Sequence, residues 1–182
     1  VNVSFNGPVG RNCTITGGSG NCTVTIPQYS PAGTFTVHAT TRDNTDNTHY
    51  YSPSELGTLG FPNQWTNEGL TDTQAPVLTS FDFNPKVIDT TNSAQQVVVT
   101  LATTDDLSGT QSVNVSFDGP GQSNNCTVGG GSGSCTMTFP QYSKSGSYTV
   151  HATTRDEVQN THFYSTSELG TLGFPNQMIN EG

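Results

Sequence analysis

An internal repeat is the feature that most constrains how this chain can fold. Residues 1–69 align with residues 113–182 with one single-residue gap, and 49 of the 69 aligned pairs are identical. The shared stretches include VHATTRD at 37–43 and 150–156, and SELGTLGFPNQ at 54–64 and 167–177. The period of about 113 residues is far longer than the roughly 20 to 50 residues of solenoid repeats. We therefore expect each copy to be a domain with its own core.

The segment 70–112 occurs only once. The expected domains are residues 1–69, the C-terminal two thirds of one repeat, and residues 70–182, a complete repeat. Both ends fall at nearly the same phase of the period, which favours a window on a longer tandem array. An incomplete β domain exposes unpaired strand edges. We therefore expect the first copy to be completed by strands from an adjoining repeat of one long polypeptide, the favoured reading, or from a neighbouring subunit.

Polar and apolar residues alternate along several segments, which is the pattern of strands with one buried face. The segments are 113–117, 135–139 and 148–152, with further strands expected at 96–104 and around 78–87. Seven or so short strands in about 110 residues are typical of an immunoglobulin-like sandwich. The expected fold class is all-β, with tandem immunoglobulin-like β-sandwich domains and one short capping helix per repeat.

The capping helix is predicted from its start and stop signals. Ser52 is suited to the N-cap, Pro53 to the first helical position and Glu55 to the reciprocal position of a capping box. Gly60 then ends a helix of two turns or fewer. Ser165 and Glu168 repeat the capping pair in the second copy.

The four cysteines form two local pairs, Cys13 with Cys22 and Cys126 with Cys135, each flanking a glycine-rich turn. Two alternating strands joined by such a turn would form a hairpin, and we expect a cross-strand disulfide in each. A zinc site is the competing interpretation, but this spacing does not match its usual ligand patterns. Disulfides indicate an oxidising, extracellular compartment.

Composition excludes some classes of partner. The chain has 14 acidic and 5 basic residues and a formal net charge of -9. Binding to nucleic acid relies on Lys and Arg to neutralise phosphates, so nucleic acid is not an expected partner. No apolar run approaches the roughly 18 residues of a membrane span, and no leader precedes Val1, so we expect no membrane insertion.

Five N-x-Ser/Thr sequons are candidate glycosylation sites on the hairpins near the cysteines. Several such sequons would also arise by chance in a chain this rich in Asn and Thr. They begin at Asn2, Asn12, Asn21, Asn114 and Asn125.

Three acidic motifs carry a resemblance to a known class of proteins. They are DTQAP at 72–76, TDDLSG at 104–109, and the turn after VHATTRD at 43–47 and 156–160. These segments resemble the opening, the loop after the second strand and the last hairpin loop of bacterial extracellular immunoglobulin-like and cadherin-like tandem repeats. The resemblance implies a surface fibre or the stalk of an adhesin.

The residues themselves predict where these carboxylates lie. In an immunoglobulin topology the start of a domain and the loops after its second and sixth strands share one end. Asp72, Asp105, Asp106, Asp156 and Glu157 would therefore meet at the joint between the copies, with Asp43 and Asp46 as the first-copy counterparts of the last loop. Such a cluster would repel itself without a cation, and calcium is the expected cofactor, stiffening the joint. The alternative is a set of solvated turn residues.

The histidines and the possible catalytic residues form two further candidate sites. If the hairpin around Asp43–Asn47 is symmetric, His38 and His49 face each other across two strands, as a transition-metal pair or as exposed strand residues. No G-x-S-x-G motif occurs, and no His lies in a motif that activates Ser or Cys. Asp105 and Asp106 are neighbours and cannot flank a glycosidic bond from two sides. The chain is not expected to be an enzyme.

Two functions remain. The first is a structural repeat unit of an extracellular fibre or cell-surface stalk, whose partners are other copies of itself. The alternative is an adhesive module that binds carbohydrate or a surface, with surface glycans as partners. Sugar-binding β modules usually present exposed aromatic residues, but Trp65, the single Trp, is replaced by Met178 in the second copy. The structural reading is therefore favoured.

Overall fold

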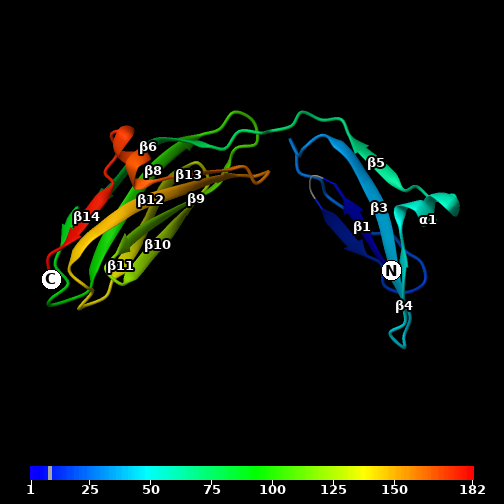
Figure 1. The fold of residues 1–182 in the computed structure, drawn as a ribbon, viewed down its shortest axis with the longest axis horizontal. Coiled ribbons are helices and arrows are strands. Elements are labelled where there is room, and N and C mark those ends of the chain that lie inside the picture. The colour runs from blue at the N-terminus through cyan, green and yellow to red at the C-terminus, as the bar shows by residue number, and fades with distance from the viewer. Residues whose placement is uncertain (8–9) are drawn as a thin grey trace. The chain divides into compact units, whose positions relative to one another are not determined.

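Strands dominate the computed structural model, which describes residues 1–7 and 10–182 (Figure 1). The expected all-β class is confirmed. The chain divides into two compact units, Val1–Thr73 (unit 1) and Gln74–Gly182 (unit 2). Among the described residues, no helix has the length and apolar character of a membrane span.

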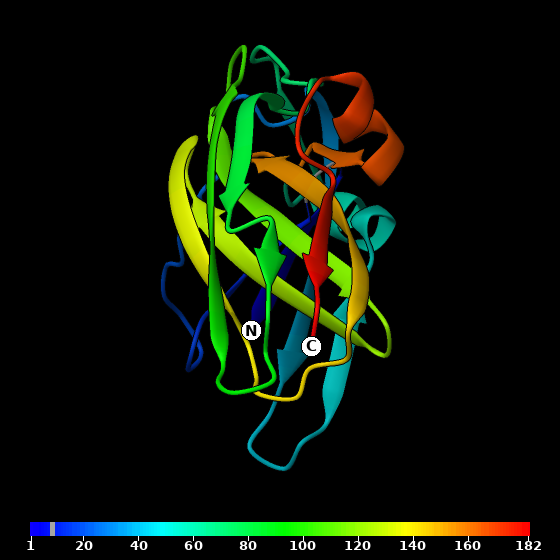
Figure 2. The same ribbon diagram turned by 90° about the vertical axis from the view of Figure 1, so that its left-hand side faces the viewer.

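Unit 2 consists of two sheets, seen in Figure 2 with this unit towards the viewer. The larger sheet has the order β10-β9-β12-β14-β7, with β13 pairing β12, and the smaller has the order β11-β8-β6. All of these pairings are antiparallel except β14 with β7. The strands are β6 (Val77–Asn84), β7 (Val87–Ile88), β8 (Gln95–Thr104), β9 (Thr110–Gly119), β10 (Gln122–Gly129), β11 (Ser132–Phe139), β12 (Gly146–Asp156), β13 (Thr161–Tyr164) and β14 (Gln177–Asn180). The strand expected around 78–87 is divided into β6 and β7, and β14, with four residues, is too short to show alternation.

One hydrophobic core fills unit 2 between its sheets. The inward apolar positions of 113–117 and 148–152 are all buried, and in 135–139 Met137 and Phe139 are buried while Cys135 is partly buried, as expected for strands with one inward face. An edge-to-face aromatic series crosses this core, with ring centroids 4.8 Å apart for Phe83 and Phe117 and 5.3 Å apart for Phe139 and Tyr148. Both contacts join the two sheets, because Phe83 and Phe139 belong to the smaller sheet and Phe117 and Tyr148 to the larger.

The two helices begin where the sequence predicts. They are α1 (Pro53–Thr58) and α2 (Thr166–Thr171), and the Oγ atoms of Ser52 and Ser165 each accept a hydrogen bond of 3.2 Å from the backbone N–H three residues on. The glutamates at those positions do not close the capping box through their side chains. Their carboxylates instead contact His49 and His162, at 3.1 and 2.8 Å. Leu169 of α2 packs into the core of unit 2.

Unit 1 has a single sheet in its described residues. Its strands are β1 (Asn2–Asn6), β2 (Arg11–Thr14), β3 (Gly33–Arg42), β4 (Thr48–Tyr51) and β5 (Gln64–Asn67), in the order β2-β1-β3-β4 with β5 also pairing β3. The registers match those of the larger sheet of unit 2: Val3 pairs with Ala39 as Val115 pairs with Ala152. Among the described residues of unit 1, Phe35 and Leu56 are the only buried hydrophobic side chains.

Candidate functional site

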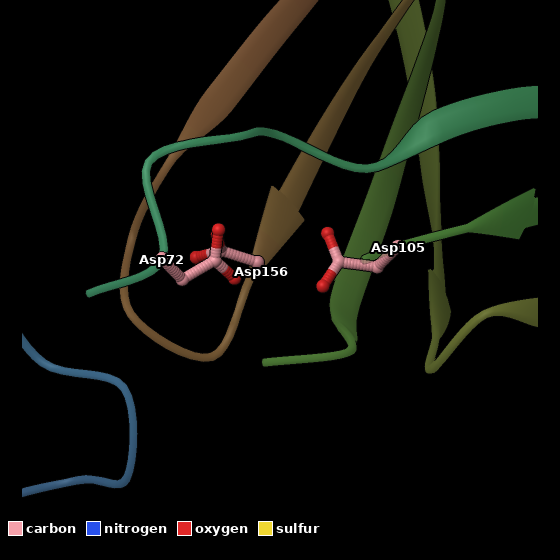
Figure 3. Close-up of side chains that lie close together, drawn as sticks. All are labelled: Asp72, Asp105 and Asp156. Carbon is pink, nitrogen blue, oxygen red and sulfur yellow. The ribbon is translucent and has the colours of Figure 1, made fainter. Parts of the chain in front are cut away.

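Three carboxylates expected to meet are brought together. Asp72, Asp105 and Asp156 each offer one oxygen, and these oxygens all lie within 4.8 Å of one another. Asp72 lies in the segment that leads into β6, Asp105 follows β8, and Asp156 ends β12. Figure 3 shows the Asp105 carboxylate pointing towards the other two.

Asp156 is held by the turn that it begins. Its Oδ1 accepts hydrogen bonds from the backbone N–H groups of Val158 and Asn160, at 2.9 and 2.8 Å. Its Oδ2 accepts one of 2.7 Å from Nδ2 of Asn160. The side chain is fully buried, so the turn fixes both its position and its rotamer. The orienting role of Asn160 was not foreseen, although the D-x-x-x-N spacing common to both copies was its signal.

Asp105 is held in a similar way by the loop after β8. Its Oδ2 accepts hydrogen bonds from the backbone N–H groups of Gly109, at 2.7 Å, and Leu107, at 3.3 Å. Its Oδ1 is a buried atom with no hydrogen-bond partner among the described residues. Asp72 is 2% exposed, and its backbone N–H donates to the carbonyl of Tyr29 at 3.0 Å. Two of the three carboxyl groups are thus shielded from water.

The other predicted ligands lie outside this group. Asp106 and Glu157 are exposed, and Glu157 accepts a hydrogen bond of 3.4 Å from Gln111. In unit 1, Asp46 pairs with Arg42 at 2.6 Å. The carboxylate of Asp43 accepts hydrogen bonds from Asn47 and Thr45, and these lower its pKa to about 2. Asp43 is the counterpart of Asp156, but among the described residues it belongs to no group of three potential metal ligands.

The donor set is suited to a hard cation. All three side chains offer oxygen, which Ca²⁺ and Mg²⁺ prefer, and none offers the nitrogen or sulfur typical of a zinc site. Burying like charges side by side is unfavourable unless a cation or a proton neutralises them. Calcium takes roughly 6 to 8 oxygen ligands, so backbone carbonyls or water would complete the shell.

Both expected disulfides are present, Cys13–Cys22 and Cys126–Cys135. The expected setting, a hairpin of two paired strands, is wrong. Cys126 lies on β10 in the larger sheet of unit 2, and Cys135 lies on β11 in the smaller one. The turn between them passes from one sheet to the other because β11 pairs with β8. The disulfide therefore joins the two sheets covalently.

The facing arrangement of His38 and His49 that a symmetric hairpin would give is wrong, and His49 is an exposed strand residue, which is the alternative. The backbone bond from Asp43 N–H to the Asn47 carbonyl places Thr41, not His38, opposite His49. The imidazole of His38 contacts the ring of Tyr50, with centroids 5.4 Å apart. The register of this turn thus separates the two imidazoles, and they do not form a metal pair.

The sequons fall into two groups. Asn12, Asn21 and Asn125 are exposed. Asn2 and Asn114 are half-buried, and their Nδ2 atoms donate to the threonine hydroxyls across the strand pair at 3.2 and 3.0 Å. Glycosylation of either of these two side chains would replace one of the two hydrogens on its Nδ2 atom.

Comparison with models of known protein families and with curated proteins gave no match to this chain.

Proposed function

We propose that this chain is a structural repeat unit of an extracellular fibre or cell-surface stalk, whose partners are further copies of the same repeat. One observation carries the proposal: the 5-stranded sheet of unit 1 recurs, strand for strand and in the same register, within the 6-stranded sheet of unit 2, and each carries a disulfide at the same position. Phe35 pairs with Trp65 in unit 1 as Tyr148 pairs with Met178 in unit 2. β2 of unit 1 carries Cys13, and the matching strand β10 of unit 2 carries Cys126. Repetition of one covalently braced unit favours a load-bearing series over a single binding site.

The finer fold assignment belongs to the same proposal. Two mainly antiparallel sheets with a shared core and a helix at one end support an immunoglobulin-like sandwich for the complete repeat. The disulfides support an extracellular setting, because such bonds persist in oxidising compartments. The proposal assigns no catalytic role, no nucleic acid and no membrane insertion.

Images of the native material test this proposal. A fibre built from the repeat should appear as beads at regular spacing along a filament. Isolated particles that bind glycans would instead support the adhesive alternative and contradict the structural one.

We also propose that Asp72, Asp105 and Asp156 bind calcium. The proposal is supported by the shielding of two carboxyl groups and by the buried Oδ1 of Asp105, which has no hydrogen-bond partner among the described residues. Extracellular calcium modules typically bind in the range of about 0.1 to 1 mM.

Titration calorimetry with calcium chloride tests this site. We expect uptake of one ion per chain, weakened at least roughly tenfold by Asp105→Asn, which removes a charged ligand. Asp82→Asn is the matched control, because Asp82 is an exposed strand residue paired with Lys86 and lies outside the acidic group. Absence of calcium uptake, or equal effects of the two substitutions, would show that the three aspartates are only turn residues.

A further inference from the structure

The inner face of the unit 1 sheet is open. It lines an apolar groove of about 480 Å³. The residues that matter here are Val3, Phe5, Ile15, Val24, Ile26 and Trp65. Trp65 is 39% exposed, and the other five are half-buried. Their counterparts in unit 2 are at most 4% exposed: Val115, Phe117, Val128, Met137, Phe139 and Met178.

In unit 2 the smaller sheet, formed by β6, β8 and β11, covers the corresponding face. β6 and β8 pair with each other, β8 pairs with β11, and their inward side chains pack on the larger sheet. Phe83 of β6 lies against Phe117, the counterpart of Phe5. The chain contains one copy of the segment that forms this cover, and that copy is used by unit 2.

A second observation points to the kind of cover that unit 1 lacks. Residues 132–139 form β11, paired with β8 along its length. The closely similar residues 19–26 form no strand. The difference is not one of local sequence, because cysteine, threonine and the alternating apolar residues occur at the same places. A strand needs a neighbour for its N–H and C=O groups, and the neighbour that β11 uses has no counterpart beside residues 19–26.

We propose that the open face of unit 1 binds a β-hairpin with the strand pattern of β6 and β8, contributed by another copy of the repeat. This inference rests on the proposed function, because it takes from it that repeats of this kind are joined in series. The second strand of the hairpin adds to residues 19–26 by antiparallel pairing. Its register follows from unit 2, where Val97 pairs with Met137 and Val99 with Cys135. Val24 and Cys22 then lie opposite the hairpin's counterparts of Val97 and Val99.

The unpaired segment favours a hairpin over other apolar occupants. A lipid or a small hydrophobic molecule could cover Trp65 and Phe5, but it would leave the backbone of residues 19–26 without strand partners. Packing of two open unit 1 faces against each other could pair their two unpaired segments, but it would not supply the inward side chains that β6 and β8 place on the larger sheet of unit 2. A hairpin of this pattern supplies both those side chains and a strand partner for the backbone.

The experiment compares the 182-residue chain with a version that carries a second copy of residues 74–112 directly before Val1. That position is suited to the test because Ser112 directly precedes Val113, the counterpart of Val1. The matched control carries the same extension with Phe83→Asp and Val99→Asp in the added copy only. Trp65 is the single tryptophan of the chain, so its emission reports on this face alone. Amide hydrogen exchange at residues 22–26 reports on the added strand.

We expect the extension to shift Trp65 emission to shorter wavelength. It should also slow amide exchange at residues 22–26 by at least roughly 100-fold, because these amides would then exchange only when the whole unit unfolds and no longer through local opening of the segment. The control should leave both unchanged. Equal behaviour of extension and control would overturn the proposal. So would a concentration-dependent dimer of the unextended chain in which Trp65 is already buried, because a second open face would then be the occupant. If the extension closes unit 1 but native material consists of isolated particles, the fibre proposal fails and the hairpin site stands.

Discussion

Removal of the disulfide between the sheets of unit 2 should cost this unit a defined amount of stability. Cys126 and Cys135 are separated by 9 residues, and in the chain-entropy model a loop of that length contributes about 2.6 kcal/mol. Cys126→Ala with Cys135→Ala removes the crosslink and also two sulfur atoms that pack against the core. Reduction of the unaltered chain removes only the crosslink. Reduction should therefore lower the free energy of unfolding of unit 2 by about 2.6 kcal/mol. The double substitution should lower it by more, because it also removes the two packed sulfur atoms.

Native-state hydrogen exchange at the central amides of β9 and β12 measures this loss within the whole chain, because those amides exchange when unit 2 unfolds. A loss of about 2.6 kcal/mol corresponds to exchange about 80-fold faster. Cys13→Ala with Cys22→Ala is the matched control, since that disulfide has the same separation of 9 residues but belongs to unit 1. The reasoning is refuted if the β9 amides change by less than roughly 1 kcal/mol on reduction, well below the chain-entropy value. Equal acceleration by the unit 1 pair would also refute it.

Two further predictions concern single side chains. Gly119→Ala should destabilise unit 2 by about 1 to 3 kcal/mol, because the new Cβ would lie 2.2 Å from Cδ1 of the buried Tyr148. Gly129→Ala is the control and should be nearly neutral, because its new Cβ meets no atom within 4 Å. Equal unfolding midpoints in denaturant for the two variants would contradict this prediction. The pKa of Asp43 is lowered from 3.8 to about 2 by hydrogen bonds from Asn47 and Thr45, so the turn should be fully stabilised above about pH 4 and lose that support as the pH falls towards 2. A carboxyl ¹³C titration should place the midpoint near 2, and a midpoint near 3.8 would show that the bonds do not persist in solution.

Much of the fold could be predicted from local patterns. Alternation located β8 at Gln95–Thr104 against an expected 96–104, because an inward and an outward face leave a period of two in the sequence. The capping serines located both helices, because an N-cap bonds within its own first turn. The cysteine partners could also be predicted, since each pair flanks one turn. These features depend on residues close together in the chain.

The candidate site was predictable only in part. The topology indicated that Asp72, Asp105 and Asp156 would converge, but neighbouring residues were equally acidic in the sequence. Asp106 is one residue from Asp105 and is exposed. Which carboxylate turns inward depends on backbone bonds of the loop, such as Gly109 N–H to Asp105, and composition does not reveal them. The histidine pairing failed for a related reason, since the register of a hairpin depends on which residues close its turn.

By itself the sequence determined the repeat, the positions of the main strands, the helix caps and the cysteine pairs, because each rests on contacts between near neighbours. The tertiary structure alone decided which apolar faces are covered. Residues 19–26 and 132–139 are identical at five of eight positions and share their polar and apolar alternation, yet only the second segment is a strand. Val3 and Val115 have the same neighbours in sequence but different exposure. The physical reason is that a strand is completed by hydrogen bonds and side chains from a distant segment. A segment can have the alternating sequence of a strand, but it forms one only where the rest of the molecule places a neighbouring strand beside it.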